Sequence, residues 1–234
     1  MKIPRWVNLN VSRVLLALGS VLLCQEAGAA TLCTDLPPSI LRVYDLKAPA
    51  VEAMVVPAAE LAGRGTAGDL ASRHTLMVTE SELVAWFTIE HQLVPRDDGL
   101  VCDAPSVVRM GFGATGRRAF LARAAAANSC VREEMLNHEA SHTHALNEAV
   151  KRFINQHESD FRRGMVALKA APAPNSETAI SRWEIGLQAI VTESKRQLSG
   201  EIRAANAHID EPPALTKLEN ACGGKIRQLE DRHS

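Results

Sequence analysis

The sequence predicts an α+β domain in which a small antiparallel sheet is followed by a long antiparallel helical hairpin. Over residues 75–122, β-branched and aromatic residues alternate with turn signals, which is typical of short antiparallel strands. Two stretches follow, at residues 129–169 and 177–208, in which apolar residues recur every three or four positions. A proline-containing segment separates them, so we expect two helices that fold back on each other.

The first 29 residues are typical of an export signal. Lys2, Arg5 and Arg13 give the segment a positively charged start. The apolar run that follows, Val14–Leu23, is too short to span a bilayer comfortably. The small residues Ala27-Gly28-Ala29 then form a cleavage site. We therefore expect a single secreted domain at residues 30–234 that is periplasmic or secreted and has no stable membrane span. An uncleaved anchor is the alternative.

Charge and cysteine content bear on the possible partners and on the disulfides. Without residues 1–29, the chain carries 23 basic and 26 acidic side chains, a net charge of about −3 that does not favour nucleic acid as a partner. Four cysteines remain, and an even number behind an export signal predicts two disulfides. Sequence leaves three pairings open. We favour Cys102–Cys130, which would join a strand to the start of the helix predicted at residues 129–169. The other bond would then be Cys33–Cys222, which would join the two ends of the domain.

Residues 30–128 are expected to be mostly β or irregular. Prolines and glycines break residues 31–69, where only Val51–Val56 is a candidate strand. Leu83–Glu90 could instead be helical, because Thr79-Glu80-Ser81-Glu82 resembles a helix start. We expect Arg117–Ala122 to form the sheet edge that pairs with an extended substrate. The expected antiparallel strands are Thr75–Val78, Leu83–Val94, Leu100–Cys102, Ser106–Gly113 and Arg117–Ala122, with a turn at Gly113-Ala114-Thr115-Gly116.

Residues 129–234 are expected to be helical, and the first helix carries the motif H-E-x-x-H at His138, Glu139 and His142. Residues four apart lie on one face of a helix, so both imidazoles can bind one metal ion. A glutamate between them is suited to act as general base on a metal-bound water. The motif therefore predicts a Zn²⁺ site with Glu139 as the catalytic residue. The alternative is a histidine pair that is hydrogen-bonded inside a helical core.

The third zinc ligand is predicted from the register of the hairpin. If the turn is centred near Ala173, His138 lies beside His208, because both helices rise by about 1.5 Å per residue. His208 also lies on the apolar stripe of the second helix. We therefore predict His208 as the third ligand, with Asp210, Glu201 and Glu184 behind it. Asp210 could equally orient a histidine without binding the metal.

The run from Arg117 to His142, R-R-A-F-L-A-R-A-A-A-A-N-S-C-V-R-E-E-M-L-N-H-E-A-S-H, resembles secreted zincin-like bacterial proteins of unassigned function. They show a strand, a cysteine and then a helix carrying H-E-x-x-H, and the later A-H-I-D at Ala207–Asp210 followed by Cys222 is also similar. The resemblance implies a metallopeptidase-like fold in the periplasm. It does not extend to residues 31–99.

Two functions are compatible with this sequence. The first is an exported zinc-dependent peptidase-like hydrolase that acts on a protein or peptide substrate through a metal-activated water. The second is a non-catalytic envelope binding or structural protein, with either a structural zinc site or a metal-free helical core. Glu139→Gln distinguishes the hypotheses, because it should abolish turnover in an enzyme while leaving folding and metal content intact, and should change little at a structural site.

Overall fold

The computed structural model describes Cys33 and residues 36–64, 72–74, 76–169 and 171–232, which belong to one compact unit. The predicted signal segment, residues 1–29, lies outside the described residues, as do residues 65–69 of the stretch that was expected to be irregular. Within the described part of the chain, no helix is long and apolar enough to cross a membrane.

The sheet is organised around one long strand, β7 (Val107–Ala122). On one side β7 pairs in parallel with β1 (Ile40–Leu46) and, further along, with β2 (Glu52–Val56). On the other side it pairs antiparallel with β4 (Met77–Glu90), which in turn pairs with β3 (Ser72–His74). The expected small antiparallel sheet is therefore wrong in its pairing, because two of the strands run parallel to β7.

Several strand predictions are corrected by this arrangement. The strand expected at Val51–Val56 is confirmed as β2, and Leu83–Glu90 is part of β4 rather than a helix. β1 was not expected, because the nearby prolines predicted irregular structure. Arg117–Ala122 is paired on both sides, by β2 and by β4, so it is not a free edge. The remaining short elements are α1 (Ala58–Ala62), β5 (Leu93–Pro95), β6 (Val101–Asp103) and α2 (Arg123–Ala126).

A β-bulge replaces the turn that was expected at Gly113–Gly116. β4 pairs Glu82 with Thr115 and Glu80 with Arg118, so Ser81 faces two residues of β7, Gly116 and Arg117. Gly116 has φ +61°, a left-handed conformation that glycine adopts without steric cost. Because of the extra residue, the odd-numbered side chains of β7 after the bulge point to the face of the sheet that the even-numbered side chains occupy before it. As a result the Arg117 side chain is buried, whereas that of Arg118 is 63% exposed.

Gly116→Ala is expected to lower the free energy of unfolding by about 1–2 kcal/mol, because an L-residue is strained in the left-handed region. No atom lies within 4 Å of a Cβ at Gly116, so the cost is conformational rather than steric. Gly200→Ala is the control. Gly200 lies inside a helix with an equally open Cβ position, and alanine there should raise stability by about 0.5–1 kcal/mol. Chemical denaturation measures both changes, and equal changes of the same sign would contradict the assignment.

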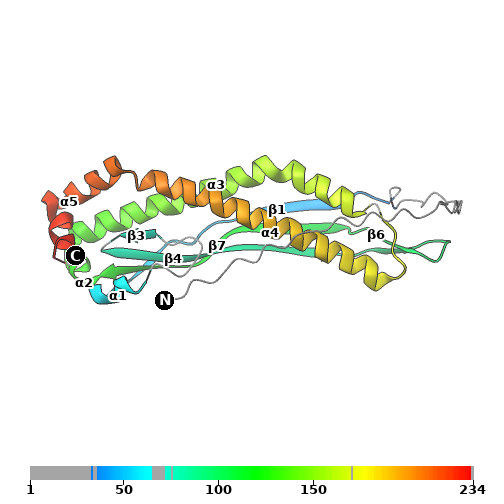
Figure 1. Cartoon of the computed structure of the whole chain (residues 1–234), viewed down its shortest axis with the longest axis horizontal. Helices are drawn as coiled ribbons and strands as arrows, with labels where there is room; N and C mark the ends of the chain where they lie inside the picture. Colours follow the sequence, from blue (N-terminus) through cyan, green and yellow to red (C-terminus); the bar gives the residue numbers. More distant parts are fainter. Residues whose placement is uncertain (1–32, 34–35, 65–71, 75, 170, 233–234) are drawn as a thin grey trace, which may run out of the picture. The chain divides into compact units, whose positions relative to one another are not determined.

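The long helices agree closely with the sequence. The structure forms α3 (Ser129–Lys169), α4 (Ser176–Ile209) and α5 (Pro212–Glu230), and α5 is interrupted by non-helical backbone at residues 221–224. Asn128 caps α3, since its Oδ1 accepts a hydrogen bond from Val131 N at 3.1 Å. α3 and α4 pack side by side on one face of the sheet, and α5 lies near the start of α3 (Figure 1).

The apolar core has two parts with a polar layer between them. In the first, Phe112 of β7 and Leu146 and Phe153 of α3 pack against α4. In the second, residues from the other end of β7 pack with Val131 and Met135 of α3 and with α5. Between the two clusters lies a polar layer, in which Arg117 of β7 and Glu139 and His142 of α3 are buried.

Both favoured disulfides are wrong, because the structure pairs Cys33 with Cys102 and Cys130 with Cys222, each with Cα atoms 5.9 Å apart. Cys102 lies in β6, whose Val101 exchanges two 2.8 Å backbone hydrogen bonds with Ala173 in the α3–α4 connection. Cys130 begins α3 at the opposite end of a 41-residue helix, about 60 Å away. A disulfide needs Cα atoms within about 7 Å, so Cys102 cannot reach Cys130.

Candidate metal centre

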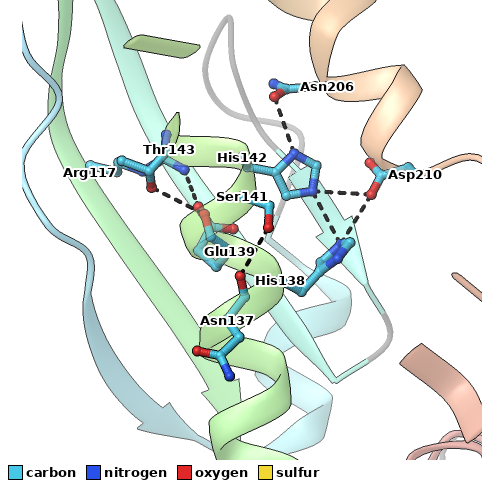
Figure 2. A network of polar contacts seen from close by, with 9 residues as sticks. All are labelled: Arg117, Asn137, His138, Glu139, Ser141, His142, Thr143, Asn206 and Asp210. Atoms are coloured by element: carbon cyan, nitrogen blue, oxygen red, sulfur yellow. Dashed lines mark hydrogen bonds and ion pairs between the residues drawn. The ribbon is translucent and has the colours of Figure 1, made fainter. Parts of the chain in front are cut away.

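Three side chains from α3 and α4 converge on one point: His138, His142 and Asp210 (Figure 2). The Nε2 atoms of His138 and His142 are 3.2 Å apart. Asp210 Oδ1 lies 3.2 Å from His138 Nε2 and 3.1 Å from His142 Nε2. The three potential ligand atoms therefore form a nearly equilateral triangle.

Helical spacing on both elements brings these groups together. His138 and His142 are four residues apart on α3, and Asn206 and Asp210 are four residues apart on the last turn of α4. Each pair lies along one face of its helix, and the two faces meet. His142 contacts Asn206, and His138 contacts Asp210. Position 174 is midway between the two residues of each pair, so the helical hairpin is centred there.

Asn206 orients the more buried histidine. The Nδ1 atom of His142 lies 3.2 Å from Asn206 Oδ1, and an amide oxygen can only accept a hydrogen bond. Nδ1 therefore carries the proton, and the lone pair of Nε2 points to the other two groups. This is the arrangement in which outer partners fix the tautomer of metal-binding histidines.

The environment favours the neutral form of the His138 imidazole. Burial, followed by the neighbouring His142, lowers the pKa of His138, while Asp210 acts in the opposite direction. Metal binding requires the neutral form of histidine, so a lowered pKa keeps the ligand available near neutral pH. The His142 side chain is 3% exposed and that of Asp210 is 40% exposed, so the site is open to solvent on the Asp210 side.

The position of Asp210 favours a cation nearby. Asp210 is the C-terminal cap of α4, and its backbone N–H donates to Asn206 O at 3.2 Å. The C-terminus of a helix carries a partial negative charge, so a carboxylate there is electrostatically unfavourable. A bound cation would offset both this charge and that of the carboxylate.

The three groups can hold a metal ion. Nitrogen and oxygen ligands at about 2.0–2.1 Å from a tetrahedral ion lie about 3.3 Å from one another. The observed separations of 3.1–3.2 Å are close to this value. The residues present therefore fit one face of a tetrahedral site and leave its fourth position to a further ligand.

Glu139 lies on a different face of α3 from the two histidines, about 100° around the helix axis from His138 and about 60° from His142. Its carboxylate forms an ion pair with the guanidinium of Arg117, and the exposed fractions of the two side chains are 1% and 3% (Figure 2). Figure 2 shows Glu139 directed at β7, whereas the two imidazoles are directed at α4. The structure thus brings together two of the three residues of the motif and holds the third in a separate contact.

His208, the predicted third ligand, does not join the group. Its side chain is 80% exposed, and its Nδ1 lies 2.7 Å from Glu211 Oε1. The hairpin is centred on residue 174 rather than on residue 173. A shift of the centre by one residue changes the position opposite His138 by two residues, from 208 to 210. Two residues are about 200° on a helix, so Asp210 takes the place that was predicted for His208. Glu184 and Glu201 do not bind at this point either, because Glu184 is exposed and Glu201 lies outside the group.

Sequence reasoning missed two residues that contact the H-E-x-x-H motif. Asn206 could have been found from the pattern N-x-x-x-D at the end of the second helix, which matches the four-residue spacing of the histidines. Arg117 could not, because only the bulge at Gly116 decides which of two adjacent arginines faces the helices.

Comparison of the chain with protein-family models, curated proteins and solved structures found no match in any of the three.

Proposed function

We propose that the protein is an exported zinc-binding protein in which one Zn²⁺, held by His138, His142 and Asp210, fastens the end of α4 to α3. The observation that carries the proposal is the triangle of three ligand atoms separated by 3.1–3.2 Å. Two imidazoles and one carboxylate suit Zn²⁺, and the separations suit its tetrahedral coordination. The two disulfides support a compartment outside the cytoplasm.

A role in holding the helices together is favoured over catalysis by the position of Glu139. A general base must come within about 3 Å of the water that it deprotonates. The Glu139 carboxylate is instead paired with Arg117, in a buried site on the face of α3 that is directed at β7 (Figure 2). We therefore propose that this glutamate is structural, and that the protein belongs to the binding or structural class.

A zinc-dependent hydrolase remains the second candidate, and one observation favours it. Three protein ligands leave a coordination position open, as in catalytic zinc sites, and the partly exposed Asp210 keeps that position near solvent. In this case the ion would supply a polarised water, and the substrate would be a protein or peptide. The resemblance to secreted zincin-like proteins supports the same candidate.

Elemental analysis of the oxidised chain, residues 30–234, purified without a polyhistidine tag, tests the primary proposal. We expect about one zinc per chain, and little zinc in His142→Ala or Asp210→Asn because each variant removes one of three ligands. His208→Ala is the matched control, since this exposed histidine lies two residues from Asp210 and should leave zinc content unchanged. Zinc lost equally from all three variants, or absent from the parent after zinc supplementation, would contradict the site.

Hydrolysis is tested separately, with a peptide library and the same proteins. Zinc-dependent cleavage by the parent that disappears in His142→Ala but persists in His208→Ala would establish the second candidate. Glu139→Gln is a poor probe by itself, because it leaves the buried Arg117 without its counter-charge and so changes folding together with any activity. Its stability therefore has to be measured beside its activity.

A further inference from the structure

The ion pair between Arg117 and Glu139 lies between two apolar clusters. On α3, Met135 belongs to one cluster and Leu146 to the other, and Glu139 and His142 are the buried residues between them. On β7, Ala114 belongs to the cluster that contains Leu146 and Ala119 to the other, and the buried Arg117 lies between them. The ion pair and the metal-binding group thus occupy one polar layer and are joined through a single turn of α3.

We propose that Arg117 is a positioning residue for the metal centre. Its ion pair with Glu139 fixes the rotation of α3 about its own axis, and so holds the imidazoles of His138 and His142 where a single ion can bind both. This inference rests on the proposed zinc-binding function. It gives the glutamate of the H-E-x-x-H motif a role on the sheet side of the helix.

The arrangement of the layer supports this role. α3 is held from one side by β7, through Glu139, and presents its histidines on another side to α4 (Figure 2). A side-chain tip lies about 6 Å from the helix axis, so a rotation of only about 20° displaces an imidazole by about 2 Å. Metal–ligand distances tolerate deviations of about 0.2 Å. Small rotations of α3 would therefore separate the ligands.

The apolar neighbours alone do not supply this precision. Aliphatic contacts are non-directional, and cores of this kind tolerate alternative packing before they lose stability. An ion pair between a guanidinium and a carboxylate is directional. In some proteins, buried polar or charged groups select one arrangement of the helices over others. Arg117 is itself set by the backbone, because the bulge at Gly116 turns it toward the helices.

The experiment compares zinc affinity in the parent and in Arg117→Met/Glu139→Met, which replaces both charges by apolar side chains of similar length. Such replacements of a whole buried pair usually preserve folding. The control is Arg162→Met/Glu158→Met, the same substitutions in a half-exposed pair on the same helix. Zinc dissociation constants are measured by competition with a chromophoric chelator. The visible absorption of bound Co²⁺ reports ligand geometry, which a change in stability alone does not alter.

We expect the Arg117→Met/Glu139→Met variant to fold and to bind zinc about 10- to 100-fold more weakly, with an altered Co²⁺ spectrum, as other outer partners of metal ligands do when removed. The control should match the parent. An unchanged dissociation constant and spectrum would overturn the positioning role while leaving the zinc site standing. A parent that binds no zinc would overturn both.

A second variant covers the case in which the double variant does not fold. Arg117→Lys keeps the charge but loses the planar fork that fits a carboxylate. We expect a folded protein with zinc affinity between those of the parent and of a His142→Ala variant. Parental affinity and an unchanged Co²⁺ spectrum in Arg117→Lys would overturn the inference.

Discussion

Arg117→Met by itself is expected to lower the free energy of unfolding by about 3–5 kcal/mol, the usual cost of removing one partner from a buried ion pair. The Glu139 side chain is 1% exposed, so the variant would remove the guanidinium from beside a carboxylate that stays out of reach of solvent. The loss comes from this desolvated charge rather than from the missing contact, which is why replacing both partners should cost far less. Denaturant unfolding of the oxidised protein measures the difference.

The adjacent arginine provides the control for that measurement. Arg118→Met makes the same substitution one residue along the strand, where the side chain is 63% exposed and its nearest ion-pair partner, Glu80, is 4.0 Å away. We expect a change within about 0.5 kcal/mol, as for surface positions in general. If the two variants unfolded at the same denaturant concentration, Arg117 would not be the buried member of the pair.

Zinc is expected to raise the melting temperature of the apoprotein by about 8–16 °C. A ligand that binds only the folded state at about 1,000 times its dissociation constant adds about 4 kcal/mol, and each kilocalorie is worth about 2–4 °C in a chain of this size. The gain should be large because Asp210 and the histidines belong to different helices, so unfolding disperses the ligands. Thermal melting of chelator-treated protein, with and without zinc, measures the shift.

Two variants show whether that shift arises at the proposed site. In His142→Ala the zinc-dependent rise should largely disappear, because the most buried of the three groups is removed. In His208→Ala it should persist, since that histidine is paired with Glu211 on the surface. A rise of equal size in His142→Ala would mean that zinc stabilises the chain from another place.

The helices could be predicted closely from sequence, since the signals that define them are local. The bounds expected for the first helix, residues 129 to 169, are those of α3. The second was expected at 177 to 208 and spans Ser176–Ile209 as α4. Apolar periodicity, the prolines between the two helices and the cap at Asn175 all act within a few residues, so they can be read without knowing the fold.

The sheet could not be predicted equally well, because strand pairing is set by contacts between distant residues. β1 joins β7 across more than 60 positions, and its own sequence lies among prolines that suggested a loop. The glycines at 113 and 116 were interpreted as a turn between two strands. In the structure Gly113 has Leu46 so close that a Cβ would clash with it, and Gly116 forms the bulge of one continuous strand.

The candidate site could be predicted only in part, because it combines a local spacing on one helix with contacts between distant elements. The histidine pair follows from a spacing of four on one helix. The third group depends on where the hairpin is centred, and an error of one residue there exchanges His208 for Asp210. The contact of Glu139 depends on the bulge in β7, which no feature of the helix reveals.

The disulfides also have a consequence for how the chain reaches its native covalent state. Each bond joins neighbours in the order of the four disulfide-bonded cysteines, the first with the second and the third with the fourth. A chain exported from its N-terminus, as proposed, presents Cys33 and Cys102 to an oxidase before Cys130 and Cys222 emerge. Oxidation in order of emergence therefore produces the native pairs directly, and maturation should not depend on a disulfide isomerase.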